Sequence, residues 1–130
     1  GKANIIQNGE DITIVTWGAL VQKSVEATKK TNISVEIIDL RTLVPLDFDT
    51  ILQSIKKTNR LIVVHEDNLT NGFGAEIVSK ISDVGFEFLD APIKRVASKD
   101  SPIPYSQVLE DEILVQIDWI VDSINELGQY

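Results

Sequence analysis

The chain has 130 residues, and its 20 acidic and 12 basic side chains give a net charge of −8 at pH 7. This length suits one domain with a substantial core, and the negative charge argues against nucleic acid or anionic membranes and favours a basic protein partner. Cysteine is absent, which excludes disulfide and thiolate chemistry, and no apolar run approaches the ~20 residues of a membrane span.

The first forty residues predict three strands and one helix. Residues 3–6 fit a short strand, and the Asn-Gly pair within residues 7–10 is typical of a tight turn between paired strands. Residues 12–17 and 33–40 are apolar runs that we expect to form strands. Between them, residues 19–30 carry apolar side chains at helical spacing. We therefore expect an N-terminal hairpin that adds one antiparallel edge strand.

The middle of the chain predicts a second helix and a central strand. Asp47 follows a loop fixed by proline and stands where it can cap a helix over residues 48–55. Residues 61–64 are four apolar residues without alternation, which indicates a strand covered on both faces. Helical spacing then returns over residues 75–81.

The last third predicts two short strands and a terminal helix. Residues 86–89 and 94–97 carry strand signals, and residues 114–127 place apolar and acidic side chains on opposite faces of a helix. Strands that alternate with helices predict a three-layer α/β/α sandwich, with a mostly parallel five-stranded sheet and one antiparallel edge strand. We expect residues 1–130 to form a single domain that, without an initial Met, is a fragment of a longer chain.

The central strand should deliver polar side chains to the carboxyl edge of the sheet, where α/β proteins bind ligands. His65 is the only histidine and the sole candidate catalytic residue, as a proton donor. The alternative is a structural histidine at a domain interface, and Glu66 and Phe73 are further interface candidates. Asp39, Glu66 and Asp67 could form an acidic pocket for Mg²⁺, but Trp17 stands where such a site needs acids. The NGFG segment lacks the residues of a phosphate loop.

Six segments in order carry a resemblance to a known family: EDITIVTWG, EIIDLRTLVPLD, TNRLIVVHED, NGFGAEI, FLDAPIKRV and SPIPYSQVLED. Together they resemble the C-terminal domain of the β subunit of thiamine-diphosphate-dependent 2-oxo acid dehydrogenases, in the transketolase C-terminal-domain family. Transketolase and deoxyxylulose-phosphate synthases share this domain, but FLDAP and PIPY favour the 2-oxo acid dehydrogenases. His-Glu followed by LTNGFGAEI resembles the branched-chain enzymes, with pyruvate or acetoin dehydrogenase as the alternative.

The resemblance implies a role in an oxidoreductase that decarboxylates a 2-oxo acid, of the 2-oxoisovalerate type, and transfers the acyl group to a lipoyl acyltransferase. It implies that thiamine diphosphate and Mg²⁺ bind between two other domains of the full enzyme. We therefore expect no cofactor or metal site in these residues and no activity of this domain alone. The implied partners are the other domains or the α subunit, a second β subunit and the acyltransferase, in the bacterial cytoplasm or the mitochondrial matrix.

In relatives of this family, a basic subunit-binding domain of the acyltransferase meets an acidic surface near the end of the β subunit. The matching residues expected to bind this partner are Glu110, Asp111, Glu112, Asp118, Asp122, Glu126 and Tyr130. Such a surface would speed encounter with a basic partner and make binding sensitive to salt. The alternative is the solvated side of a terminal helix. Relatives commonly have a proline near the start of this helix, where this chain has Val115 and Gln116.

A second class of function uses the same fold as an autonomous ligand-binding or signalling module. An assembly domain predicts exposed apolar surface and self-association. A module predicts a monodisperse monomer with a saturable site for Mg²⁺ or a small molecule. The ordered family segments favour the assembly domain.

Overall fold

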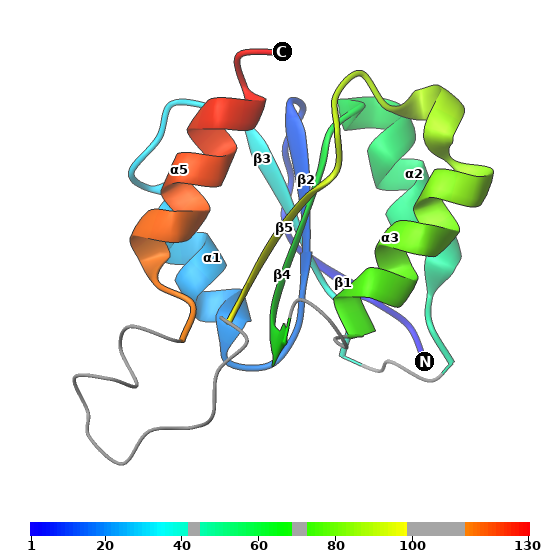
Figure 1. Cartoon of the computed structure of the whole chain (residues 1–130), viewed down its shortest axis with the longest axis horizontal. Coiled ribbons are helices and arrows are strands. Elements are labelled where there is room, and N and C mark those ends of the chain that lie inside the picture. The colour runs from blue at the N-terminus through cyan, green and yellow to red at the C-terminus, as the bar shows by residue number, and fades with distance from the viewer. Residues whose placement is uncertain (42–44, 69–72, 99–113) are drawn as a thin grey trace.

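The computed structural model describes residues 1–41, 45–68, 73–98 and 114–130. These residues form five strands, four α-helices and one short 3₁₀ helix (Figure 1). In chain order the elements are β1 (Asn4–Gln7), β2 (Ile12–Thr16), α1 (Leu20–Thr28), β3 (Val35–Asp39), α2 (Phe48–Thr58), β4 (Leu61–Asn68), α3 (Phe73–Val84), η1 (Phe86–Phe88), β5 (Lys94–Ser98) and α5 (Ile117–Leu127).

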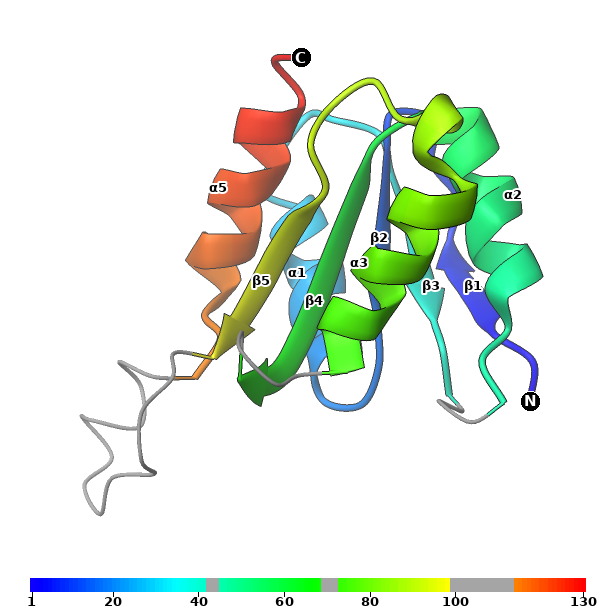
Figure 2. The same cartoon turned by 45° about the vertical axis from the view of Figure 1, so that its right-hand side comes forward.

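The five strands form one sheet in the order β1-β3-β2-β4-β5. The pairs β2–β3, β2–β4 and β4–β5 are parallel, and only β1 runs antiparallel, against β3. The helices cover both faces, with α1 and α5 on one side and α2 and α3 on the other (Figures 1 and 2). The predicted three-layer α/β/α sandwich, with a mostly parallel sheet and one antiparallel edge strand, is therefore confirmed.

Each face of the sheet builds its own core, because successive side chains of a strand point to opposite faces. On the α1/α5 side, Ile14 and Ile62 are fully buried and pack with Ile124 of α5. On the α2/α3 side, Val63 packs with Ile55 of α2 in a second cluster. This double cover explains why β4 reads as an unbroken apolar run. No helix in the described ranges is both long enough and apolar enough to cross a membrane.

The predicted N-terminal hairpin is wrong, because β1 pairs with β3 and not with β2. Both edges of β2 are occupied by the parallel strands β3 and β4, so β1 cannot pair with β2 and instead lies at the outer edge of β3. The chain reaches β2 by passing over β3 at Gly9. A side chain fits there only if the backbone moves, since an added Cβ would lie 2.2 Å from the carbonyl carbon of Val35 and 2.3 Å from the nitrogen of Glu36.

Other predicted elements also differ from the structure; α2, for example, ends at Thr58 and not at residue 55. The segment 86–89 is not a strand: η1 follows α3 directly, and its turns are closed by hydrogen bonds from Phe88 N to Gly85 O and from Leu89 N to Phe86 O. Strand β4 continues to Asn68, four residues beyond its predicted end. Helix α5 begins at Ile117, three residues after its predicted start.

Asp47 is the N-cap of α2, as predicted. Its side chain accepts hydrogen bonds from the Thr50 backbone nitrogen at 3.3 Å, the Thr50 hydroxyl at 2.7 Å and the Ala3 backbone nitrogen at 2.9 Å. The bond from the Thr50 side chain, followed by that from Ala3, lowers the pKa of Asp47 from its ordinary value of 3.8. One carboxylate therefore starts α2 and also anchors the N-terminal segment.

Asp47→Ala is expected to destabilise the protein by about 1–2 kcal/mol, because it removes a helix cap. Since the folded-state pKa is lowered, this contribution is present above pH 3.8 and is lost as the pH falls through the lowered value. Urea unfolding followed by circular dichroism at neutral and acidic pH measures both effects. Asp49→Ala, an exposed carboxylate in the first turn of the same helix, is the control, and an equal loss in the two variants would contradict the capping role.

Candidate functional site

The carboxyl edge of the sheet holds a cluster of three aromatic side chains, Trp17, His65 and Phe73. Parallel pairing sets Thr16 opposite Val64, so the residues that follow them lie side by side. The rings of Trp17 and His65 stack with centroids 5.9 Å apart and planes 12° apart. Phe73, at the start of α3, meets Trp17 edge to face at 6.1 Å. Sequence reasoning identified these residues separately and missed the stack, which the register of β2 and β4 produces.

His65 is fully buried. It lies within β4 and not after the strand end, and its ring lies against the first turn of α3. An added Cβ at Gly74 would be 2.4 Å from both Cδ2 and Nε2 of His65, so the glycine is what lets this helix approach the imidazole. Full burial fits the structural alternative for His65. Its roles as a proton donor and as an interface residue stay predictions.

The other residues expected at this edge do not assemble around one point. Glu66 is exposed, and its backbone carbonyl accepts a hydrogen bond from Ser98. The carboxylate of Asp39 accepts from the backbone nitrogen of Arg41 at 3.0 Å. Among the described residues, no group of three or more His, Cys, Asp or Glu side chains lies close enough to hold a metal ion.

Gly74→Ala is expected to cost about 1–3 kcal/mol of stability, because the methyl group must displace an imidazole held by its stack on Trp17. The near-ultraviolet circular dichroism of tryptophan should change as well, since the stack moves. Ser79→Ala, on the exposed side of the same helix, is the control and should stay within about 0.5 kcal/mol of the parent. Equal urea midpoints for all three proteins would show that the ring moves freely.

A second polar cluster lies under α2, around the side chain of Glu36 in β3. This carboxyl group is 2% exposed and forms an ion pair with Lys57. It also accepts hydrogen bonds from the Ser54 hydroxyl at 2.6 Å and the Gly9 backbone nitrogen at 3.2 Å. Burial alone would raise the pKa of Glu36, but the donors Lys57, Ser54 and Gly9 outweigh it and lower that pKa. The same hydrogen bond raises the pKa of Lys57.

Sequence reasoning missed Glu36. The available signal was a carboxylate inside an apolar run, between Val35 and Ile37, at a place where the strand buries both faces. Lys57 and Ser54 stand at helical spacing on the element that packs there, and both supply hydrogen-bond donors. A buried charge that is paired and hydrogen-bonded on every side is normally structural.

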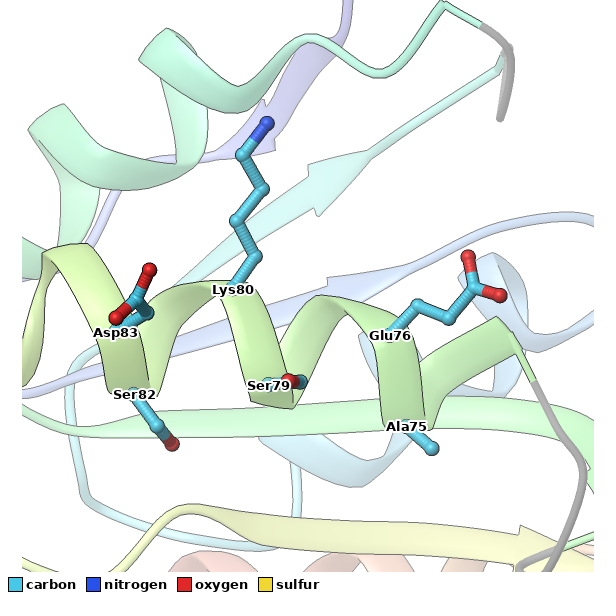
Figure 3. A pocket seen from close by; sticks show the side chains of 6 residues that line it. All are labelled: Ala75, Glu76, Ser79, Lys80, Ser82 and Asp83. Carbon is cyan, nitrogen blue, oxygen red and sulfur yellow. The ribbon is translucent and has the colours of Figure 1, made fainter.

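The outer face of α3 carries a shallow, open hollow lined by Ala75, Glu76, Ser79, Lys80, Ser82 and Asp83 (Figure 3). The side chain of Lys80 extends toward α2, where its Nζ lies 4.6 Å from the ring centroid of Phe48 (Figure 3). The lining side chains all come from one exposed helix. This hollow therefore does not bring chemical groups together from different elements, and it is a surface and not a catalytic site.

Four of the seven predicted partner-binding residues lie in the described part of the chain: Asp118, Asp122, Glu126 and Tyr130. Asp118 forms an ion pair with Lys30 at 3.6 Å, and Glu126 forms one with Lys94 at 2.6 Å. Asp122 is exposed between them, with no ion pair in the described ranges. Glu110, Asp111 and Glu112 lie outside the described residues.

Comparison with known proteins decides the family. Residues 1–120 match the family described as "Transketolase, C-terminal domain". The chain belongs to the transketolase C-terminal domain family. Two solved structures share the domain fold. A split-gene transketolase matches with a TM-score of 0.81 and 19% identity, over 98% of this chain and 41% of that one. The 2-oxoglutarate:ferredoxin oxidoreductase of Magnetococcus marinus matches with a TM-score of 0.64 and 13% identity, over 99% of this chain and 20% of that one.

Curated relatives of this family member are β subunits of multi-subunit enzymes. The chain is 41% identical to the mitochondrial pyruvate dehydrogenase E1 component subunit beta of Dictyostelium discoideum, over 99% of the chain and 37% of the relative. It is 46% identical to the pyruvate dehydrogenase E1 component subunit beta of Staphylococcus aureus, over 82% of the chain and 34% of the relative. It is 42% identical to the beta subunit of acetoin:2,6-dichlorophenolindophenol oxidoreductase of Bacillus subtilis, over 98% and 38%. The chain therefore spans between about a third and two fifths of the length of these relatives.

Proposed function

We propose that this transketolase C-terminal domain serves as the C-terminal assembly domain of the β subunit in a 2-oxo acid dehydrogenase. The observation that carries this proposal is identity of about two fifths or more to pyruvate dehydrogenase and acetoin-enzyme β subunits, over most or all of the chain. The full enzyme would be a thiamine-diphosphate-dependent oxidoreductase with a lipoyl acceptor. We propose that the cofactor binds outside these residues, in the other domains of the full enzyme.

The relatives do not support the branched-chain assignment drawn from the LTNGFGAEI segment. The matched subunits named above are of pyruvate dehydrogenase and of an acetoin-oxidising enzyme. We therefore propose the pyruvate or acetoin type as the substrate class of the full enzyme. The named relatives come from a mitochondrion and from bacteria, which supports the mitochondrial matrix or bacterial cytoplasm as the compartment.

The surface at the end of α3 supports a role in building subunit interfaces. Phe86 is 72% exposed and Val84 is 47% exposed. They adjoin a mainly apolar hollow lined by Val78, Ser82, Phe86, Leu89, Ala91, Pro92 and Ile93. An exposed aromatic ring beside an apolar hollow is typical of a surface that another protein covers. The proposed occupants are the α subunit or a second β subunit of the assembled enzyme.

A chimera tests the assembly role. The segment of the Staphylococcus aureus β subunit that matches this chain is replaced by residues 1–130, and the protein is co-expressed with the native α subunit. We expect a mixed oligomer that reduces an artificial electron acceptor when given pyruvate. The negative control is a graft of the matching domain of the split-gene transketolase, which has the same fold but is only 19% identical to this chain. This graft should not restore activity. A parallel graft into the Bacillus subtilis acetoin enzyme compares the two substrate classes, and failure of both grafts would contradict the proposal.

We further propose that the acidic face of α5 contributes to docking of the acyltransferase. Its buried side carries Ile120, Ile124 and Leu127, and its exposed side carries Asp118, Asp122 and Glu126. Because Lys30 and Lys94 already pair with two of these acids, Asp122 is the carboxylate most available to a basic partner. Lysines on the partner would have to compete with the two internal ion pairs.

Asp122→Lys in the assembled enzyme is expected to weaken binding of a basic acyltransferase subunit-binding domain by about tenfold or more, with a larger effect at low salt. Isothermal titration at two salt concentrations measures it. Glu76→Lys, an equal charge reversal at an exposed position of α3, is the matched control because α3 and α5 lie on opposite sides of the sheet (Figure 1). Equal affinities for the two variants would move docking away from α5.

A further inference from the structure

A continuous chain of buried hydroxyl groups joins Glu36 to the backbone beyond α2. The Ser54 hydroxyl lies 2.6 Å from Oε2 of Glu36 and 2.6 Å from the hydroxyl of Thr13. The Thr13 hydroxyl lies 2.7 Å from that of Thr58, which lies 3.2 Å from the carbonyl oxygen of Arg60. None of the four side chains is more than 3% exposed. Four contacts therefore link β3, α2, β2 and the residue before β4 in one line.

The number of protons in this chain decides its direction, because each hydroxyl can donate only one. If Glu36 is ionised, it only accepts, so Ser54 donates to it, Thr13 donates to Ser54, and Thr58 donates to Thr13. No proton then remains for the Arg60 carbonyl, which already accepts from the Thr13 backbone nitrogen at 2.9 Å. The contact that lacks a proton is also the longest of the four.

A protonated Glu36 would supply the missing fourth proton. It would donate to Ser54, and each hydroxyl would then donate to the next, ending at the carbonyl of Arg60. The two protonation states of one carboxyl group therefore correspond to opposite directions of the whole chain. The reversal needs rotation of hydroxyl hydrogens and no movement of heavy atoms beyond the Thr58 to Arg60 contact.

The surroundings of Glu36 favour the ionised state. Oε1 accepts from Lys57 of α2 and from the backbone nitrogen of Gly9. Two acids lie nearby: Asp49, which together with Glu36 and Lys57 lines a hollow between β1 and α2, and Glu10, whose charge acts on Lys57. Lys57 is in direct contact with Glu36, whereas in the described part of the chain Asp49 and Glu10 form no hydrogen bond with Glu36.

We infer that Glu36 is a positioning residue whose negative charge sets the direction of this hydroxyl chain and ties the N-terminal turn at Gly9 to α2. The carboxylate accepts from both sides at once, from the turn through Oε1 and from the hydroxyl chain through Oε2. The strand β1 is thereby joined to the covering helix through a buried charge. This inference does not depend on the proposed enzyme.

Three variants of the 130-residue protein distinguish the effect of reversing the hydroxyl chain from the effect of removing the charge of Glu36. In Glu36→Gln, the amide nitrogen can donate to Ser54 and the amide oxygen can accept from Lys57 and Gly9, so the chain should reverse with every contact filled. A crystal structure should show the Thr58 to Arg60 contact shortened to about 2.8 Å, and the unfolding constant should rise by less than about tenfold. Glu36→Leu leaves the donors Lys57, Ser54 and Gly9 without an acceptor and should raise the unfolding constant more than about 100-fold.

Lys57→Met is the control, because it removes the ion pair and keeps the acceptor, so the Thr58 to Arg60 distance should stay unchanged. Carbon-13 spectra of the parent chain need no variant: the Glu36 carboxyl signal should stay that of a carboxylate from about pH 8 to about pH 5. The inference is overturned if Glu36 takes up a proton in that range. It is also overturned if Glu36→Gln costs as much as Glu36→Leu or leaves the Thr58 contact at its present length.

Discussion

Gly9→Ala is expected to destabilise the protein by about 3 kcal/mol or more and to detach the N-terminal strand from the sheet. The added methyl carbon would lie 2.2 Å from the carbonyl carbon of Val35 and 2.3 Å from the nitrogen of Glu36. Both are backbone atoms of β3, which is paired on both edges, so they cannot move aside as a flexible side chain would. The turn must therefore lift off, and the bond from Gly9 to Glu36 is lost with it.

Hydrogen exchange and urea unfolding together check this result. Backbone amides of β1 should exchange faster than in the parent, while those of β2 and β4 keep their order of protection. Gly18→Ala is the matched control, since Gly18 has a positive φ of 65° and nothing within 4 Å of an added Cβ. It should cost only about 1 kcal/mol through backbone strain. A loss at Gly9 no greater than that at Gly18 would mean that the turn can relax without leaving β3.

Much of the fold follows from local patterns in the sequence. The unbroken run at the start of β4 indicates a strand covered on both faces, and Ile62 and Val63 do point into opposite cores. Asp47 is the N-cap of α2, as its position before an amphipathic segment predicts. Such features depend on residues near one another in the chain, so a single sequence contains them.

The errors arise where distant segments compete for the same place. An Asn-Gly turn favours a hairpin, but β3 and β4 occupy both edges of β2, so β1 pairs with β3. Phe86 and Phe88 alternate with a polar residue as a strand would, but β5 takes the position beside β4, and the segment closes into a 3₁₀ turn. The sequence pattern describes what a segment can form, and the sheet order decides which option is realised.

The candidate site divides in the same way. His65 and Trp17 could be selected from their residue types, but their stacking depends on the register between β2 and β4. Glu36 could not be assigned a role from spacing alone. Its partners Gly9 and Lys57 are 27 and 21 residues away and come from different elements. A buried carboxylate is understandable only when all of its donors are known.

Ile62→Ala and Ile55→Ala are each expected to cost about 2–5 kcal/mol, because both side chains are fully buried. They belong to different clusters separated by the sheet, so their effects should add within about 0.5 kcal/mol. Since a domain of this size has only about 5–15 kcal/mol of stability, the double alanine variant should be largely unfolded. The milder Ile→Val changes therefore serve for the additivity test by urea unfolding.

Two controls test whether additivity depends on burial and on the two residues lying in different cores. Ile5→Ala removes a 44% exposed side chain from β1 and should cost far less than either core change. Ile62→Val combined with Ile124→Val lies within one cluster, where the losses should not add simply, because the second cavity adjoins the first. Strong coupling between Ile55 and Ile62 would contradict two separate cores. Additivity there, with coupling inside the α1/α5 cluster, would show that the sheet separates two cores that lose stability independently.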